Sequence, residues 1–404
     1  MYVIIFIINN IEKVFKMDLN KIKATQIVGL DEKLKSNKKL TVKLGFDPTS
    51  PDLHLGHYVV LRFVKQLQDL NHKIVLVVGD FTASIGDPSG RSSTRPVLSM
   101  EQIEKNAQTY INQLGLVVDL NKVEIKKNSS WLSKIDATDM IKYMSKITVS
   151  QMLSREDFKN RYENNEPISL HEFTYPIMQA LDSVFLDADL EVGGTDQTFN
   201  LMIGRQLQKA LNKEEQAVVT FPILVGLDGV KKMSKSLNNY IGLTASPEEK
   251  FGLIMSVSDE TMFNYFEILI GKTEDEINEM KFSNVNPMLL KMELAKDVVA
   301  IFHGNDVANI EKDKFVNKFS KKTINEDDLE IFEINESEIQ LFKLIHNLGF
   351  SESMNDARRK IEQGGVKINN EKVTDKNLIL NKHNFNNSFI LKVGKVKVIK
   401  CLFK

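Results

Sequence analysis

The sequence contains very little cysteine. Cys401 is its one cysteine among 404 residues. An internal disulfide is therefore excluded, and so is any zinc site that needs several cysteines. This composition fits a reducing compartment, and the location we expect is the cytoplasm.

The sequence also lacks a marked net charge and a long apolar segment. Its formal net charge is -1 at pH 7, which indicates no particular partner, because a neutral total can hide local basic surfaces. The apolar start, residues 1–8, is too short to cross a bilayer and has neither a basic beginning nor a cleavage site of small residues. We expect no membrane segment. Residues 1–32 are an extension and lead-in, of which residues 1–16 are either dispensable or the product of a start codon placed too far upstream.

Apolar residues make up 42% of the chain, which is enough for a sizeable core in a protein of two or three domains. Residues 55–70 repeat apolar side chains at helical spacing, between two runs that read as strands. We expect an α/β fold over residues 33–246, with a Rossmann-like, doubly wound parallel sheet and a nucleotide crevice at the strand ends. The predicted strands are residues 40–46, 74–78, 123–125, 190–192 and 217–221.

The rest of the chain predicts two further domains. Residues 247–323 show helical periods without strand signals and predict a helical domain. Residues 324–338 are rich in Asp and Glu and predict a linker or a solvated helix face. Residues 339–404 predict a small α+β module with a helix, a Gly-Gly turn, a short strand and a terminal hairpin around Gly394.

Two short signatures in the chain suit the handling of phosphate. His54 and His57 flank Gly56 at the start of a predicted helix, so both rings can face one point beside its positive end. Lys232 and Lys235 lie in a Lys-Met-Ser-Lys-Ser loop that follows two glycines. A lone histidine is more often a cap or a core residue, and a lysine cluster is more often solvated surface. Together, the two signatures favour adenylation of a carboxylate, with pyrophosphate as the leaving group.

A third set of polar residues lies between these signatures. Tyr175, Gln179 and Asp182 have i, i+4, i+7 spacing, so one helix presents them as a stripe. The stripe is embedded among apolar residues, which predicts burial and a need for polar partners, and a bound amino acid would supply them. Asp87 and Asp196 follow predicted strands. Each is a turn or cap acid by default, and each also lies where the crevice of an α/β sheet opens.

With these residues assembled, the chain resembles the bacterial tyrosyl-tRNA synthetases of class I over nearly its full length after the first thirty or so residues. The resemblance also extends to residues 357–375, which are similar to a small RNA-binding module shared with a ribosomal protein. The other matching segments are residues 45–57, 79–91, 175–182, 193–197 and 232–236.

The resemblance implies a role for each matching residue. Asp182 would receive the phenolic hydroxyl of tyrosine, and Gln197 would lie near the carboxylate. The α-ammonium would be held by Asp87, Tyr175 and Gln179. The residues implied for ATP are Asp47, Gly56, Gly193, Asp196, Lys232 and Lys235, and those implied to act on its phosphates are Thr49, His54, His57, Lys232 and Lys235. Lys43 is also placed among the tyrosine-binding residues, because it stands where some members have a tyrosine that touches the substrate hydroxyl. A lysine there marks a subgroup and leaves the second partner of the hydroxyl open.

The activity that the resemblance implies is a tyrosine–tRNA ligase, which makes tyrosyl-adenylate and pyrophosphate and then charges the 3' end of tRNA(Tyr). Mg²⁺ would enter with ATP, and no side chains are predicted as dedicated metal ligands. The helical domain would read the anticodon. Two subunits would form a homodimer through an insert at residues 129–170. The residues implied for RNA binding are Arg358, Arg359, Lys360 and Lys367.

Three other functions compete with this interpretation. A tryptophanyl enzyme shares the fold and both signatures, but Asp182 suits a hydroxyl better than an indole N–H. An RNA-binding protein that has lost catalysis would not need His54, His57, Lys232 and Lys235, all of which are present. A nucleotidyltransferase with a similar histidine signature would not need two RNA-binding units.

Overall fold

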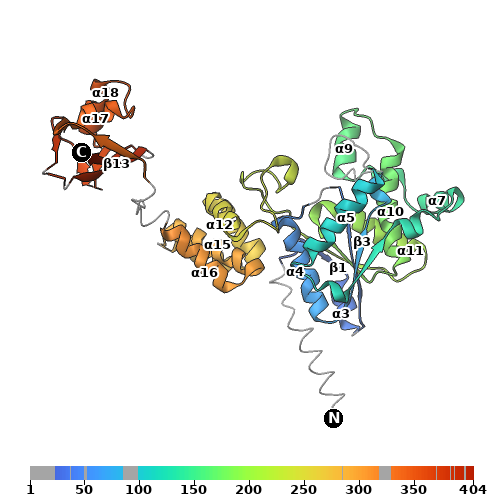
Figure 1. Cartoon of the computed structure of the whole chain (residues 1–404). Coiled ribbons are helices and arrows are strands. Elements are labelled where there is room, and N and C mark those ends of the chain that lie inside the picture. Colours follow the sequence, from blue (N-terminus) through green and yellow to red (C-terminus); the bar gives the residue numbers. More distant parts are fainter. Residues whose placement is uncertain are drawn as a thin grey trace, which may run out of the picture. The chain divides into compact units, whose positions relative to one another are not determined.

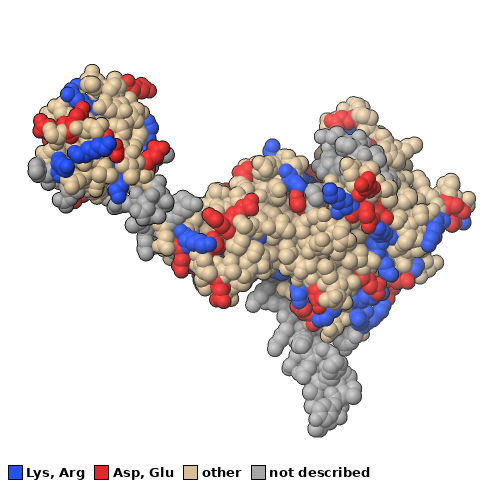
Figure 2. Space-filling view, viewed as in Figure 1, with Lys and Arg blue, Asp and Glu red and all other residues tan. Residues whose placement is uncertain are grey.

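The computed structural model describes residues 23–36, 38–49, 52–84, 99–283, 285–317, 329–369, 371–382, 384–385, 387–394 and 397–404. The predicted extension at residues 1–16 and the candidate residue Asp87 lie outside the described residues. The chain divides into two compact units, Met1–Lys312 and Asp313–Lys404 (Figure 1). Acidic and basic side chains are interspersed on the visible face of each unit in Figure 2, as expected for a chain with little net charge.

A six-stranded sheet forms the centre of the first unit, in the order β1-β6-β5-β2-β3-β4. All neighbouring strands run parallel except β1, which is antiparallel to β6. Every residue of β6 is buried, and because successive side chains point to opposite faces, both faces of the sheet are covered. The predicted doubly wound sheet is therefore confirmed. Its strands are β1 (Gln26–Val28), β2 (Thr41–Phe46), β3 (Lys73–Val78), β4 (Val123–Lys127), β5 (Leu190–Gly194) and β6 (Ala217–Phe221).

The order of the strands reverses beside β2. The chain proceeds from β2 through β3 to β4 on one side, and β5 and β6 lie on the other side. The pairing of β2 with β5 is short and consists of Val42 with Leu190 and Lys43 with Glu191. In open α/β sheets, ligands bind outside the carboxyl ends of the strands at such a switch point. The fold therefore places the candidate site beyond Phe46 and Gly194.

Edge strand β1 is a feature that the sequence did not predict. It has three residues, of which Gln26 and Ile27 are exposed. A strand this short and this exposed has no detectable alternation of apolar residues. Its pairing with β6 adds one antiparallel edge to an otherwise parallel sheet.

The helices of the first unit follow the strands. The predicted helix at residues 55–70 is α4, which buries one apolar face. Helix α10 packs against α11, and four short helices lie between β4 and α10, where the sequence predicts the insert. The helices are α3 (Leu30–Lys35), α4 (Leu55–Asp69), α5 (Met100–Leu114), α6 (Ser129–Leu132), α7 (Ala137–Met144), α8 (Val149–Met152), α9 (Glu156–Glu163), α10 (Leu170–Phe185) and α11 (Thr198–Ala210).

Helices alone follow the last strand of this unit, in the part of residues 247–317 that the structure describes. Arg62 on α4 donates a hydrogen bond of 2.7 Å to the carbonyl oxygen of Leu269, and the ring of Tyr58 meets that of Phe302 at 5.3 Å. These contacts join the helical region to the start of the βαβ unit. Its helices are α12 (Pro247–Ser256), α13 (Asp259–Tyr265), α14 (Glu274–Phe282), α15 (Pro287–His303) and α16 (Asn305–Phe315), with a π-helical turn at Phe266–Ile270.

The second unit is a small α+β module. Its main sheet has the order β10-β9-β12-β13-β7, a second sheet pairs β11 with β8, and two helices share one buried cluster with these strands. The hairpin predicted around Gly394 is formed by β12 and β13. The elements are β7 (Ile331–Ile334), β8 (Glu338–Gln340), α17 (Leu341–Asn347), α18 (Met354–Glu362), β9 (Val366–Ile368), β10 (Glu371–Val373), β11 (Ile379–Asn381), β12 (Ser388–Val393) and β13 (Lys397–Phe403).

One part of the stretch predicted as a linker is a strand instead. Strand β7 pairs in parallel with β13 and buries Ile334 in the core of the module. Glu333 is exposed and forms an ion pair with Lys404. Glu333, one of the acidic residues of this stretch, therefore belongs to the exposed side of an edge strand, whose short apolar alternation it masks.

Candidate active site

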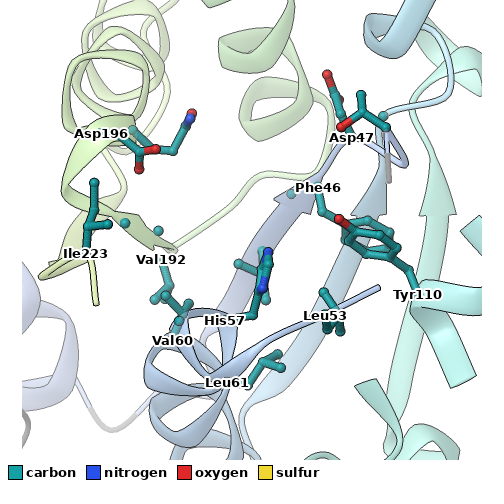
Figure 3. Close-up of a pocket in the computed structure, with 18 of the residues that line it drawn as sticks. Phe46, Asp47, Leu53, His57, Val60, Leu61, Tyr110, Val192, Asp196 and Ile223 are labelled. Atoms are coloured by element: carbon teal, nitrogen blue, oxygen red, sulfur yellow. The ribbon is translucent and has the colours of Figure 1, made fainter. Parts of the chain in front are cut away.

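A cavity of about 740 Å³ lies at the switch point of the sheet. The ends of β2 and β5, the start of α4 and one side of α10 line it. In the view of Figure 3, Asp47 and Asp196 lie on its two sides, with His57 between them. Most of the predicted site residues line this cavity, although they come from segments far apart in the chain: Asp47, Thr49, His54, Gly56, His57, Tyr175, Gln179, Asp182, Gly193, Asp196, Gln197 and Lys232.

The two histidines are held by the backbone at the start of α4. The Nδ1 atom of His54 accepts a hydrogen bond from the N–H of Gly56 at 3.2 Å. The Nδ1 atom of His57 accepts one from the N–H of His54 at 3.1 Å. The proton of each neutral ring therefore lies on Nε2. The ring centres are 4.1 Å apart, so the pair presents two neighbouring N–H donors.

Both histidines are neutral at physiological pH. Burial, together with the charges of His57 and Lys232, lowers the pKa of His54 to about 2. Burial also lowers the pKa of His57 to about 4, against a small opposing effect of its hydrogen bond with the backbone of His54. The rings can therefore donate hydrogen bonds to an anion without changing protonation between pH 5 and 8.

Gly56 is required by the position of the His54 ring. A Cβ atom at residue 56 would lie 3.0 Å from both Cε1 and Nδ1 of His54, which is closer than ordinary carbon contacts allow. A larger residue would crowd the ring, which would have to shift by a few tenths of an ångström relative to the N–H of Gly56 from which it accepts. The spacing of the signature thus has a steric reason.

The lysine loop is tied to the histidine signature through backbone pairing. Leu55 donates its N–H to the carbonyl oxygen of Ile241 at 3.0 Å, and Leu243 donates to that of Leu53 at 2.9 Å. The segment after the loop therefore runs antiparallel beside His54. Two signatures that are distant in sequence share one wall of the cavity.

Within the loop, the two lysines point to different places. Met233 between them is buried and donates its N–H to the carbonyl oxygen of Leu224 at 2.8 Å, which anchors the loop. Lys232 lines the cavity. Lys235 forms an ion pair with Asp52 and does not belong to the cavity lining. The structure thus brings one of the two predicted lysines to the site.

Two of the three residues of the polar stripe on α10 are buried, as the sequence predicts, and Gln179 is half-buried. Tyr175 is 5% exposed and Asp182 is 4% exposed. The hydroxyl of Tyr175 donates to Asp47 Oδ2 at 2.9 Å, and Asp47 Oδ1 accepts from the hydroxyl of Thr82 at 2.8 Å. The stripe is therefore anchored to the turn after β2.

Asp182 has two partners that the sequence did not reveal. Trp131 Nε1 donates to its Oδ1 at 2.8 Å, and Asn128 Nδ2 donates to its Oδ2 at 3.4 Å. Burial raises the pKa of Asp182 to about 6, although the charge of Lys43 and both hydrogen bonds oppose the rise. Carboxylate oxygens have spare lone pairs, so Asp182 can accept a further hydroxyl donor.

Lys43 lies behind the cavity wall. It is completely buried, and its Nζ forms an ion pair with Glu191 Oε1 at 2.9 Å. The same atom donates to the carbonyl oxygen of Gln179 at 2.8 Å and to Ser183 Oγ at 2.9 Å. An ammonium group has three N–H donors, and all three are occupied. In this structure Lys43 Nζ is thus occupied by protein partners, and Lys43 is not among the residues that line the cavity, so its role in binding tyrosine stays a prediction.

Sequence signals for the missed residues exist but are faint. Asn128 directly follows the end of β4, where an α/β crevice opens, and Trp131 is the one tryptophan of the chain. Glu191 is an acid inside an apolar strand, and the register pairs it with Lys43. Each feature becomes meaningful only when the register of the sheet is known.

The residues predicted to bind RNA lie in the second unit. The guanidinium of Arg358 stacks 3.9 Å from the ring centre of Phe342. Arg359 and Lys360 both form ion pairs of 2.7 Å with Asp356. Lys367 is exposed on β9. These side chains are on the surface of the module, partly neutralised by one acid.

The described residues include no group of three or more His, Cys, Asp or Glu side chains placed to hold a metal ion. Nor does any helix in this part of the chain have the length and apolar character needed to cross a bilayer.

Comparison with known protein families decides the class of the chain. The model for class I tRNA synthetases (W and Y) matches residues 35–321, and the model for the SYY-like C-terminal domain of tyrosine–tRNA ligases matches residues 322–399. The tyrosine–tRNA ligase of Francisella tularensis is 46% identical over 378 residues, which cover 93% of this chain and 94% of that protein. The chain belongs to the tyrosine–tRNA ligase family. The enzyme of that name from Haemophilus influenzae is 48% identical, over 85% of this chain and 86% of its own.

Solved structures of this fold include enzymes of both the tyrosine and the tryptophan type. Tyrosyl-tRNA synthetase from Archaeoglobus fulgidus aligns with a TM-score of 0.59 at 22% identity, over 75% of this chain and 99% of that one. Tryptophanyl-tRNA synthetase from Plasmodium falciparum aligns with a TM-score of 0.56 at 17% identity, over 77% and 90%. At this level of identity the likeness shows the fold alone, so it is the sequence relatives that separate the tyrosine–tRNA ligase family from the tryptophan enzymes.

Proposed function

We propose that this chain is a tyrosine–tRNA ligase that activates tyrosine with ATP and then transfers the tyrosyl group to the 3' end of tRNA(Tyr). The observation that carries this proposal is the composition of one cavity. Its phosphate end has two neutral histidine donors and Lys232, and its buried end has Asp182 as an acceptor. Such a cavity suits a polyphosphate and a phenol at the same time.

Tyrosine occupies the end of the cavity beside α10. Its phenolic hydroxyl donates to Asp182, whose two hydrogen bonds from Trp131 and Asn128 fix the carboxylate. Its ammonium group meets the polar atoms of Tyr175 and Gln179, and its carboxylate lies near Gln197. The role of Asp87 in the same subsite stays a prediction.

ATP occupies the end beside the start of α4. The Nε2–H groups of His54 and His57 and the positive end of the helix face its phosphates. Lys232 adds a positive charge, Thr49 a hydroxyl, and Asp196 accepts from the ribose beside Gly193. Mg²⁺ arrives bound to the phosphates of ATP, which supply oxygen ligands, and no dedicated ligands from the protein are proposed.

The reaction needs positioning and charge stabilisation but no covalent enzyme intermediate. The tyrosine carboxylate attacks the α-phosphorus of ATP in line, the bond to the bridging oxygen breaks, and pyrophosphate leaves. The histidine N–H donors and Lys232 stabilise the charge that builds on the phosphates. Lys235 joins them when it leaves Asp52 and the loop closes over the phosphates.

Selectivity for tyrosine follows from the burial of Asp182. Phenylalanine would leave this carboxylate without its hydroxyl donor in a site closed to water, which costs more than a missing apolar contact would. Tryptophan offers only an N–H on a larger ring. The subsite therefore discriminates through an unpaired acceptor rather than through shape alone.

The assembly and RNA contacts belong to the same proposal. The insert exposes large apolar side chains, which suit the interface of a homodimer. The proposed domains are the catalytic domain at residues 33–246, the helical anticodon domain at 247–323 and the RNA-binding module at the C-terminus, where Lys367 is one exposed base. Charging of tRNA then takes place in the cytoplasm. The exposed large apolar residues of the insert are Ile141, Met144, Val149, Tyr162 and Leu170.

The test is ATP–pyrophosphate exchange by the purified protein, without tRNA, with tyrosine, tryptophan and phenylalanine offered separately. We expect exchange with tyrosine alone. Exchange driven by tryptophan would overturn Asp182 as a hydroxyl acceptor. A protein that exchanges with none of the three yet binds tRNA would be an RNA-binding protein and not a ligase.

A further inference from the structure

Asn200 on α11 lies between two glutamines of the amino-acid end of the cavity. It is 1% exposed. Its Nδ2 donates to Gln179 Oε1 at 3.0 Å and to Gln197 Oε1 at 3.1 Å. An amide nitrogen has two N–H donors, so this one group forms hydrogen bonds with both glutamine side chains.

These two hydrogen bonds determine how each glutamine faces a ligand. A carbonyl oxygen has two lone pairs, so Gln179 Oε1 keeps one for an ammonium group while Asn200 uses the other. Gln179 Nε2 is directed to Glu191 Oε1 at 3.3 Å, which fixes the orientation of the whole amide. The oxygen of Gln197 is turned toward Asn200, which assigns the nitrogen to the opposite side of that amide.

The orientation of Asn200 is set in turn by the insert. Arg155, at the start of α9, is 6% exposed and donates from Nη1 to Asn200 Oδ1 at 3.4 Å. Its guanidinium is fixed by two hydrogen bonds of 2.6 Å to Asp157 and lies 4.0 Å from the ring centre of Phe158. A planar group fixed along one edge by Asp157 and on one face by Phe158 holds its Nη1 in one direction, toward Asn200 Oδ1.

We propose that Asn200 is a positioning residue for the amino-acid subsite, and that Arg155 of the insert orients it. The inference rests on the proposed function, and it adds a connection between the insert and the site. A single chain of hydrogen bonds runs from α9 through α11 to Gln179 and Gln197. A change in the packing of the insert therefore alters the affinity for the amino acid more than it alters the affinity for ATP.

Asn200→Leu is the direct test, because leucine is similar in size and removes both amide donors. We expect the KM for tyrosine in pyrophosphate exchange to rise about tenfold or more, since two half-buried glutamines lose their orienting partner. The KM for ATP should stay within about twofold, because no atom of the phosphate end is touched. The ratio of kcat/KM for tyrosine and phenylalanine should also hold, since Asp182 keeps its partners.

Arg155→Lys tests the outer step of the chain without emptying the core. Lysine keeps the charge opposite Asp157 but lacks the second nitrogen that reaches Asn200. We expect a rise of about threefold in the KM for tyrosine, in the same direction as Asn200→Leu. This variant keeps the proposal testable if Asn200→Leu fails to fold.

Gln206→Leu is the matched control. Gln206 lies on the same helix and accepts a hydrogen bond of 3.3 Å from Gln151 of the insert. Like Asn200 it does not itself line the cavity, but Gln151 does not line it either, whereas Gln179 and Gln197, the partners of Asn200, do. The KM for tyrosine should change less than about twofold in this variant. Equal effects of Gln206→Leu and Asn200→Leu, or an unchanged KM in Asn200→Leu, would overturn the inference. Absence of tyrosine exchange in the unaltered protein would instead overturn the proposed function.

Discussion

The two ends of the cavity are built in different ways. At the phosphate end, each histidine is held by a backbone N–H two or three residues away. At the amino-acid end, Asp182 is held by Trp131, which is 51 positions away, and Tyr175 contacts Asp47, which is 128 positions away. The histidine pair of the phosphate end is thus a local structure at a helix terminus, and only Lys232 reaches this end from a distant loop among the residues assigned to its phosphates. The amino-acid end is a buried network of side chains from distant segments.

This difference separates the general chemistry of the site from its selectivity. Any adenylating enzyme needs donors for phosphate, and a helix start supplies them with few residues. Selection of one amino acid needs a buried hydrogen-bond acceptor that is held in place by other side chains. These side chains come from several helices and strands. Variants at the two ends should therefore affect different substrates.

Asp182→Asn is expected to have the largest effect. The amide nitrogen would face N–H donors from Trp131 and Asn128, so the side chain loses part of its capacity to accept the phenolic hydroxyl. We expect kcat/KM for tyrosine to fall about 100-fold, as for the loss of a hydrogen bond to a charged group, while the KM for ATP stays unchanged. Steady-state pyrophosphate exchange measures both constants. A parallel rise of the KM for ATP would place Asp182 outside the tyrosine subsite.

Gly56→Ala is the corresponding variant at the phosphate end and should impair the use of ATP. The added Cβ would lie 3.0 Å from the His54 ring and displace it. Loss of one preorganised donor to the developing phosphate charge lowers kcat/KM for ATP by about 30-fold, with the KM for tyrosine unchanged. Gly252→Ala is a control, because a Cβ there meets nothing within 4 Å. Equal loss in both variants would show that displacement of the His54 ring is not responsible.

Acidification should sharpen the contrast between the two ends. The pKa of Asp182 is about 6, so its carboxylate is protonated below that value, whereas His54 and His57 stay neutral. At pH 5, kcat/KM for tyrosine should be about tenfold below its plateau, and the apparent KM for ATP should not follow. The pH profile of exchange from pH 5 to 8 gives both. If the apparent KM for ATP changed with pH around the ordinary pKa of histidine, His54 and His57 would not both be neutral in this range.

The two histidines and Asp182 make the stability of the fold depend on pH in opposite directions. The lowered pKa values of the two histidines contribute stability that is present above pH 6.5 and is lost as the pH falls through about 4 and then about 2. The raised pKa of Asp182 acts the other way, because its contribution is complete below pH 3.8 and is lost as the pH rises through about 6.

Much of the fold and the phosphate end could be predicted from the sequence. Strands β2 to β6, helix α4 and the buried stripe on α10 all have periodic or apolar signals of sufficient length. Edge strands β1 and β7 were missed because they have three and four residues and exposed or acidic faces.

The partners at the amino-acid end were not predictable for a different reason. Trp131, Asn128, Asn200 and Arg155 act through side-chain contacts that depend on the register of the sheet and the packing of the insert. Lys43 was expected near the ligand because of its place in the chain. The sequence pattern of β2 could not reveal that Lys43 forms an ion pair with Glu191 on the neighbouring strand.

Lys250→Met should have the smallest effect. Lys250 is completely buried on α12, donates to the carbonyl oxygens of Leu243 and Ala245 behind the lysine loop, and burial lowers its pKa to about 8. Freeing this segment should raise the KM for ATP about threefold and leave the KM for tyrosine unchanged. Lys291→Met, which breaks an ion pair with Asp259, is the control. An identical change in both variants would point to general loosening of the helical region.

The most direct test of the central claim compares Asp182→Asn and Gly56→Ala in one exchange experiment, with tyrosine and ATP each varied against a saturating level of the other. We expect each variant to affect one substrate: Asp182→Asn impairs only the KM and kcat/KM for tyrosine, and Gly56→Ala impairs only those for ATP. If each variant impaired both sets of constants to the same degree, the two ends would not be separate subsites, and the division drawn from the structure would be wrong.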